Sequence, residues 1–239
     1  MTTNPMVRRA ATLSGILGVG LMGLLHWLVF FWVPTERTQG VVHRILFIHV
    51  PAAWVGFLAF GIVAICSALF LWRKDDRLDT AASAAAEGGM VFTTLVLLTG
   101  PLWGRIAWGT WWLWDLKLTL TVLLWFIYFG YFLVRASTEN PERGKRFAAV
   151  IGIVGALDLP LIYFSVSWFR SIHPGPVVFT GNGPGMDPKM LATLLLGLGA
   201  STLVFVSLFI FRYRLGRLEQ ALMKRQAHGP EATLEGSSG

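Results

Sequence analysis

The amino-acid sequence predicts an all-α integral membrane protein, a six-transmembrane-helix bundle with both termini in the cytoplasm. The first observation behind this prediction is composition, because 54% of the residues are hydrophobic and only 14% are charged. Soluble domains carry about 25% charged residues. The second observation is that apolar segments long enough to cross a bilayer recur six times along the chain. The third is that lysine and arginine are concentrated in alternate connections between those segments.

Each predicted span has close to the 20 or so apolar residues that a helix needs to cross the hydrocarbon core. The second span is longer than this and is expected to tilt or protrude. The third is the least regular, because Glu87, Gly88 and Gly89 interrupt its beginning. In the fifth, Asp158 stands two residues before Pro160, which predicts a break in the helix. The six predicted spans are 14–33, 45–72, 87–103, 116–134, 147–169 and 190–211.

The distribution of basic residues predicts the direction of the spans. Fourteen of the 20 lysines and arginines lie at the N-terminus, in the 73–80 and 135–146 loops and in the C-terminal segment. The positive-inside rule places these segments in the cytoplasm. Residues 34–44, 103–117 and 170–189 then face the periplasm or the cell exterior. The net charge of +7 follows from this topology, and it does not form the basic stripe of a nucleic-acid-binding protein.

We expect residues 1–226 to form a single membrane domain. The last span continues into "RYRLGRLEQALMKRQ", a basic amphipathic helix that favours an anchor on lipid headgroups over a partner-binding segment. Residues 227–239 are expected to be a disordered tail. Its end, "LEGSSG" at 234–239, is typical of a vector-derived scar.

A tryptophan-rich stretch, "WGTWWLWD" at 108–115, lies in a predicted outer segment close behind Trp103. An aromatic belt at the membrane interface is the simplest interpretation. If the stretch formed a short helix, residues three and four positions apart would share one face and build a flat aromatic surface. These residues are Trp108, Trp111, Trp112 and Asp115, with Trp114 beside them. Such a surface favours binding of a large, flat, apolar ligand.

Two of the five histidines are predicted to lie at the same membrane depth. His49 stands a few residues inside the outer end of the second span. Pro51 follows it, and proline has no N–H to donate to the carbonyl of Phe47. His173 lies just past the outer end of the fifth span, before Pro174. Either histidine alone could be structural. Together, beside the tryptophans, they favour the two axial ligands of a haem, because neutral imidazole is a common haem-iron ligand.

Haem carries two propionates, and the outer segments offer Arg44, Arg105 and Lys117 as cationic partners. Each of them could instead be an interfacial anchor. Arginine can clamp a carboxylate through two hydrogen bonds, whereas lysine acts as a point charge. Asp115 would repel propionates. We expect it to pair with a cation or to accept hydrogen bonds from backbone N–H groups, and so to fix the shape of the tryptophan stretch.

These residues resemble a known family. "WGTWWLWDLKLT" resembles the WWD motif of haem-handling membrane proteins, and "LFIHVPAAW" and "SWFRSIHPG" on either side resemble the CcmC family of cytochrome c maturation. The resemblance covers residues from about 41 to 210. It implies that His49 and His173 bind haem b, and that the WWD segment presents the haem to the periplasmic haem chaperone CcmE. It further implies CcmA, CcmB and CcmD as partners and the bacterial inner membrane as location, with the site facing the periplasm. The family often has arginine where this chain has Lys117.

An enzyme is not expected, because the chain has neither a P-loop nor a visible nucleophile and base, so any ATP-driven step would belong to a partner. Two other functions stay open. A haem-b electron-transfer subunit of a membrane oxidoreductase usually binds haem between histidines within the bundle, whereas both histidines here lie at one edge. A haem transporter would need a polar route below the site, and the only acids inside the spans are Glu87 and Asp158.

Overall fold

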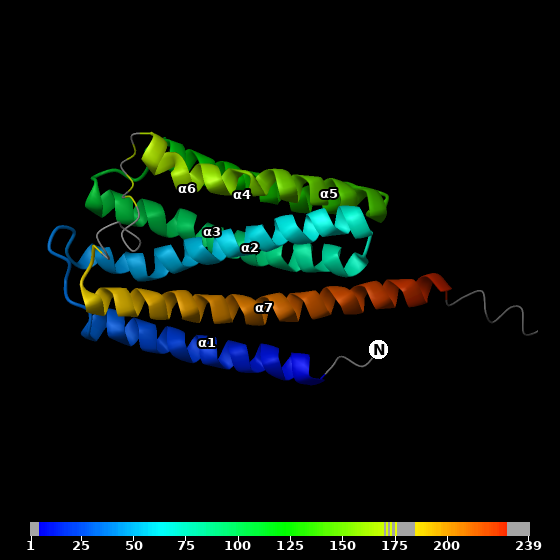
Figure 1. The fold of residues 1–239 in the computed structure, drawn as a ribbon, viewed down its shortest axis with the longest axis horizontal. Coiled ribbons are helices and arrows are strands. Elements are labelled where there is room, and N and C mark those ends of the chain that lie inside the picture. The colour runs from blue at the N-terminus through cyan, green and yellow to red at the C-terminus, as the bar shows by residue number, and fades with distance from the viewer. Residues whose placement is uncertain (1–4, 170, 172, 174, 176–184, 229–239) are drawn as a thin grey trace, which may run out of the picture.

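The computed structural model describes residues 5–169, 171, 173, 175 and 185–228. They form long helices that lie side by side (Figure 1). The elements in chain order are α1 (Pro5–Phe31), the 3-10 helix η1 (Val41–Ile45), α2 (Leu46–Arg73), α3 (Asp76–Ala107), α4 (Leu116–Ser137), α5 (Pro141–Ala156), α6 (Asp158–Trp168) and α7 (Pro188–His228). Six helical segments of the described chain are long and apolar enough to span a membrane, which confirms the predicted six-helix bundle, while the orientation of the termini stays a prediction.

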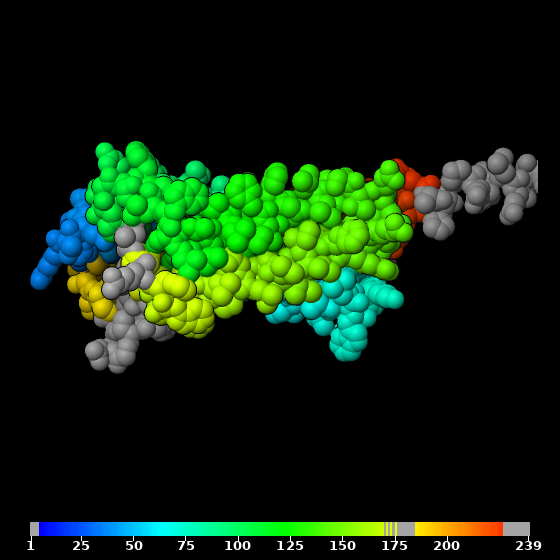
Figure 2. Space-filling model, turned by 90° about the horizontal axis from the view of Figure 1, so that it is seen from above, coloured from blue at the N-terminus to red at the C-terminus, as the bar shows by residue number. Residues whose placement is uncertain are grey.

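The helices are arranged around the pair α2 and α3. α1 and α7 pack together on one side of this pair, and α4 packs with α5 and α6 on the other (Figure 1). Figure 2 shows α4, α5 and α6 covering one long side of the molecule. The α1–α2 and α3–α4 connections lie at the same end as the end of α6 and the start of α7. We call this the tryptophan end, and we call the opposite end, where α3 and α5 begin, the basic end.

The third span begins earlier than predicted, at Asp76 and not at 87. Residues 76–86 are rich in alanine, which forms helix well but is only weakly apolar, so a hydropathy criterion misses them. The helix is capped by Asp75, whose Oδ1 accepts the N–H of Arg77 at 2.8 Å. The predicted cytoplasmic loop at 73–80 therefore shortens to a sharp turn, with Lys74 in the left-handed conformation.

The fifth span is broken, as predicted. α5 ends at Ala156 and α6 begins at Asp158, with Leu157 between them. Pro160 lies in the first turn of α6, where its missing N–H would have no helical partner in any case.

The helix that contains the last span, α7, continues to His228, so the segment after that span is helical as predicted. Its extension packs along α3: Lys224 pairs with Asp76 at 3.4 Å, and Arg212 pairs with Glu87 through two hydrogen bonds. One of the two predicted intramembrane acids thus has a cationic partner. Anchoring of this extension to lipid headgroups stays a prediction.

Close packing in the middle of the bundle depends on small residues, as is common between membrane helices. The rings of Phe60 and Tyr128 stack with centroids 3.8 Å apart, and the Tyr128 hydroxyl donates to the carbonyl of Gly152 at 2.9 Å. Nearer the tryptophan end, a Cβ on Gly197 would lie only 3.3 Å from the carbonyl oxygen of Phe47. This is the carbonyl that Pro51 leaves without its helical donor, and α7 covers it closely.

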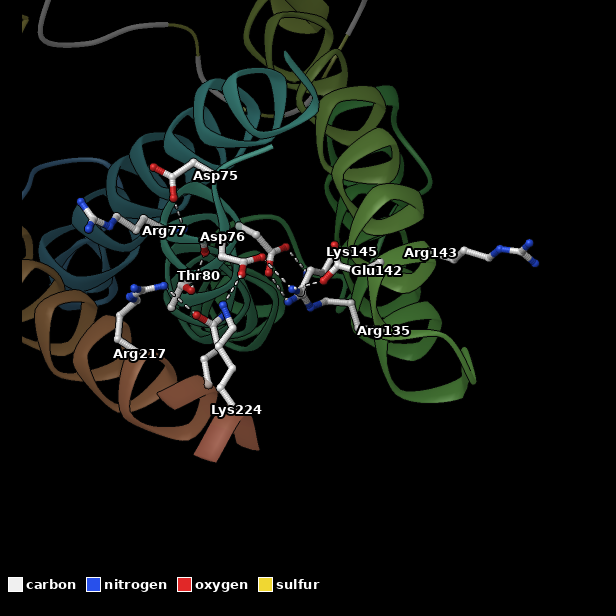
Figure 3. A network of polar contacts seen from close by, with 12 residues as sticks. Asp75, Asp76, Arg77, Thr80, Arg135, Glu142, Arg143, Lys145, Arg217 and Lys224 are labelled. Atoms are coloured by element: carbon white, nitrogen blue, oxygen red, sulfur yellow. Dashed lines mark hydrogen bonds and ion pairs between the residues drawn. The ribbon is translucent and has the colours of Figure 1, made fainter. Parts of the chain in front are cut away.

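The basic end is held by ion pairs from four helices (Figure 3). Asp79 on α3 is only 2% exposed and binds Arg135 of α4 through both carboxylate oxygens, at 2.6 and 2.9 Å. Lys145 of α5 donates to Asp76 at 2.8 Å and to Glu142 at 2.6 Å. The acidic start of α3 is therefore tied to α4, α5 and α7 at once.

We predict that Asp79→Asn destabilises the protein by about 2–4 kcal/mol, because it leaves the Arg135 guanidinium without its counter-charge in a largely buried position. Thermal unfolding of the detergent-solubilised protein measures the effect. Lys224→Ala is the matched control, since Lys224 is 72% exposed and exposed ion pairs contribute little. An equal loss of stability in the two variants would contradict the conclusion that the Asp79–Arg135 ion pair contributes most to the stability of the basic end.

Candidate functional site

The two predicted histidines lie together at the tryptophan end. His49, in the first turn of α2, is 8% exposed, and its ring centroid lies 6.5 Å from that of His173, with the ring planes inclined by 34°. A coordinating imidazole nitrogen lies about 2.0–2.1 Å from its metal and about 1.1 Å from its own ring centre, so two imidazoles on opposite sides of one metal have centroids about 6 Å apart. The observed spacing thus fits two axial ligands of one iron.

The tautomer of His49 follows from its hydrogen bond to α3. Nδ1 of His49 lies 2.8 Å from Oγ1 of Thr99. The Thr99 hydroxyl hydrogen is already donated to the carbonyl of Leu95 at 2.7 Å, so its oxygen accepts the Nδ1–H. The lone pair of Nε2 is left for a ligand, which is the arrangement that orients metal-binding histidines. No local sequence pattern pointed to Thr99, which is 50 residues away in the chain.

Trp103 forms a wall of the site. It lies inside α3, is 6% exposed, and contacts His49 and His43 edge to face at centroid distances of 5.7 and 5.9 Å. Its Nε1–H donates to Gln39 at 2.7 Å. α3 continues four residues past the predicted end of the third span, to Ala107, so Trp103 belongs to a helix. Glu36 shapes the facing loop, and hydrogen bonding from the Gln39 N–H holds the pKa of that carboxyl below its ordinary value.

The tryptophan stretch at 108–115 is not a helix, so its residues do not share one helical face as the sequence reasoning supposed. Gly109 has a φ of +77°, the left-handed conformation that commonly ends a helix, and it terminates α3. Asp115, with extended backbone, is the N-cap of α4. The stretch is a short irregular loop between two helix caps.

The indoles of this loop point in different directions. Trp108 packs against Gly104, where a Cβ would lie 3.3 Å from the indole ring. Trp112 and Trp114 meet edge to face, with centroids 5.7 Å apart and planes at 75°. Trp111 and Trp114 are 58% and 77% exposed, whereas Trp108 and Trp112 are half-buried. The loop therefore offers two exposed indoles and not a single flat platform.

A shallow, largely open apolar hollow of about 350 Å³ lies against α3, the tryptophan loop and α4. It is lined by Leu97, Pro101, Trp112, Trp114 and Val122. The Nε1–H of Trp112 is buried there without a hydrogen-bond partner. A buried donor without an acceptor is costly, which favours a ligand that brings one.

Asp115 links the tryptophan loop to His173. Its Oδ1 accepts the N–H of Leu118 at 2.9 Å, which confirms the expected hydrogen bond from a backbone N–H. Its Oδ2 accepts the hydroxyl of Ser171 at 2.5 Å, and the Ser171 oxygen accepts the N–H of His173 at 3.0 Å. Ser171 is not among the site residues that the sequence predicts. The one signal for it is its position two residues before His173, since serine often binds the N–H two residues on.

The three predicted cations lie in different places. Lys117 is half-buried and interacts electrostatically with both Asp115 and His49. Arg105 donates to the carbonyl of Gly109 at 2.5 Å and so supports the tryptophan loop. Arg44 lies over the ring of Phe30 on α1, 5.8 Å from its centroid, and its Nε is buried without a hydrogen-bond partner. Of the three, Lys117 is the one with an electrostatic interaction with His49.

Comparison with known proteins places this chain in a family. A family model described as CcmC, heme exporter protein C, matches residues 2–228. Heme exporter protein C of Bradyrhizobium diazoefficiens is 39% identical over 205 residues, covering 83% of this chain and 78% of the relative. The proteins of the same name from Haemophilus influenzae and Escherichia coli K12 are 32% and 31% identical, over 86% and 77% of this chain and 81% and 74% of the relatives. The chain belongs to the CcmC family of heme exporter protein C.

Proposed function

We propose that this protein binds haem b at the outer face of the bacterial inner membrane and presents it to a periplasmic haem chaperone for cytochrome c maturation. Membership of the heme exporter protein C family supports a role in haem handling. The single observation that carries the finer proposal is the pairing of His49 and His173, with ring centroids 6.5 Å apart.

The residues at the tryptophan end divide the work of holding haem. His49 offers Nε2 from a position fixed by α2 and Thr99, and the ring of His173, 6.5 Å away, would supply the second ligand to the iron. Lys117 is placed to attract a propionate as a point charge. The apolar hollow under Trp112 suits the hydrophobic edge of a macrocycle. The bound haem supplies the iron and the vinyl groups, and the chain supplies orientation and electrostatics.

The position of the site favours delivery over electron transfer. The histidines lie at one end of the bundle, the end that also carries the exposed indoles of Trp111 and Trp114. Large aromatic side chains of this kind are common at the centre of protein interfaces. We propose CcmE as the acceptor, CcmA, CcmB and CcmD as the other members of an exporter complex, and an ATP-driven step that belongs to those partners and not to this chain.

We predict that His49→Ala and His173→Ala each convert the bound haem from six-coordinate to five-coordinate and weaken its retention by more than about tenfold, because each removes one iron ligand. Absorption spectroscopy of the purified, haem-loaded protein measures both effects. His26→Ala is the matched control, since His26 lies in α1 with its Nδ1 bonded to the carbonyl of Met22. A six-coordinate spectrum in both single variants would refute the ligand assignment.

We predict a different result for the exposed tryptophans. Replacing Trp111 and Trp114 together by alanine should weaken acceptor docking by about 10–100-fold when the variant and wild type are compared at equal haem loading, as expected when one or two large aromatic side chains are lost from an interface. Haem transfer to the purified chaperone measures this. Trp72→Ala provides the control, since Trp72 is 76% exposed at the basic end. Normal haem transfer by the double variant would show that the two indoles do not dock the acceptor, and an aromatic belt at the membrane interface would then be their role.

A further inference from the structure

The two axial histidines are held in different ways. His49 is part of a regular helix, and Thr99 fixes its ring from the neighbouring α3. His173 follows the end of α6 and belongs to no helix. A ligand outside regular structure needs another restraint if it is to keep its ring within a few tenths of an ångström of the productive position.

A chain of hydrogen bonds supplies that restraint. The N–H of His173 donates to Oγ of Ser171, and the Ser171 hydroxyl donates to Oδ2 of Asp115. Ser171 and Asp115 are 56 residues apart in sequence, so this contact joins the chain after α6 to the start of α4. The other carboxylate oxygen caps α4 through the N–H of Leu118. His173 is therefore attached, through Ser171 and Asp115, to the first turn of the long helix α4 and not to a second loop.

The electrostatics favour a strong contact. Asp115 is the N-cap of α4, where the positive end of the helix dipole stabilises a carboxylate. Lys117 adds a positive charge nearby. Hydrogen bonds to an ionised carboxylate are about twice as strong as neutral ones, and the Ser171 hydroxyl donates to such a carboxylate.

We propose that Asp115 and Ser171 are positioning residues that hold His173 in place for iron. This inference rests on the proposed haem site, and it gives the acid of the tryptophan stretch a defined task. Asp115 contacts neither haem nor iron in this account. It acts through Ser171, and the cap on α4 keeps its own carboxylate oriented.

The test separates the tether from the cap. Ser171→Ala removes the link to His173 and leaves the Asp115–Leu118 cap intact, and Ser171→Thr restores a hydroxyl. Thr119→Val is the matched control, because it removes a 2.7 Å hydrogen bond to the Asp115 carbonyl at the same helix end without touching the carboxylate. All variants are examined as the full chain in detergent or nanodiscs.

With haem bound, Ser171→Ala should lower haem retention about 10–100-fold and show a five-coordinate fraction that added imidazole converts to six-coordinate. Ser171→Thr and Thr119→Val should match wild type. The double variant Asp115→Asn with Ser171→Ala should lose little more haem than Asp115→Asn alone, because Asp115 acts on His173 only through Ser171. A wild-type six-coordinate spectrum in Ser171→Ala would overturn the tether while leaving the haem site standing.

A second measurement needs no haem. In the haem-free protein, the amide hydrogen of His173 should exchange faster with solvent in Ser171→Ala than in wild type, because it has lost its acceptor. Equal exchange would overturn the tether even if haem binding were never observed. If Ser171→Ala exchanges faster than wild type but wild type itself binds no haem, the tether is supported and the proposed function is refuted. The two failures are therefore distinguishable.

Discussion

The approach of two imidazoles from separate spans to 6.5 Å is the constraint on which the site depends. A bilayer favours regular helices, because backbone groups in hydrocarbon must be hydrogen-bonded within the chain. Ligands that meet at a membrane surface must therefore come from helix ends and the segments just beyond them. His49 comes from the first turn of α2 and His173 from the chain after α6. Thr99 and Trp103 contact the ring of His49, whereas Ser171, which is bonded to Asp115, accepts the backbone N–H of His173.

The two ends of the bundle use polar groups for different purposes. At the basic end, the pairs of Asp79 with Arg135 and of Glu87 with Arg212 join helices, and both partners are charged. At the tryptophan end, Thr99 orients the ring of His49 through a neutral hydrogen bond, and the Asp115 carboxylate binds Ser171, which holds the backbone N–H of His173. Packing across the middle depends on close contacts such as that of Gly197 with the Phe47 carbonyl. Ion pairs thus join the helices at the end of the bundle that is far from the site. The site itself has few charges and an apolar hollow beside it.

Much of this could be predicted from the sequence, and the failures have physical causes. Hydropathy predicts the six spans, and the constant rise of a helix predicts that His49 and His173 lie at one depth. The start of α3 was missed because alanine is a better helix former than its hydropathy implies. The spacing of the tryptophans predicts a shared face only if residues 108–115 are helical. They are not, because Gly109, with a φ of +77°, ends α3. Thr99 and Ser171 could not be found, since their partners are 50 and 56 residues away and appear only once the helices have packed.

Electron paramagnetic resonance of the wild-type protein loaded with ferric haem tests the central claim most directly. Two imidazoles on one iron predict a low-spin, six-coordinate signal, with hyperfine coupling to two axial nitrogen ligands of histidine origin. Selective ¹⁵N labelling of histidine should change that coupling without changing the spin state. A high-spin, five-coordinate signal, or a low-spin signal with only one histidine nitrogen, would contradict the account, because the pair at 6.5 Å would then not be the iron site.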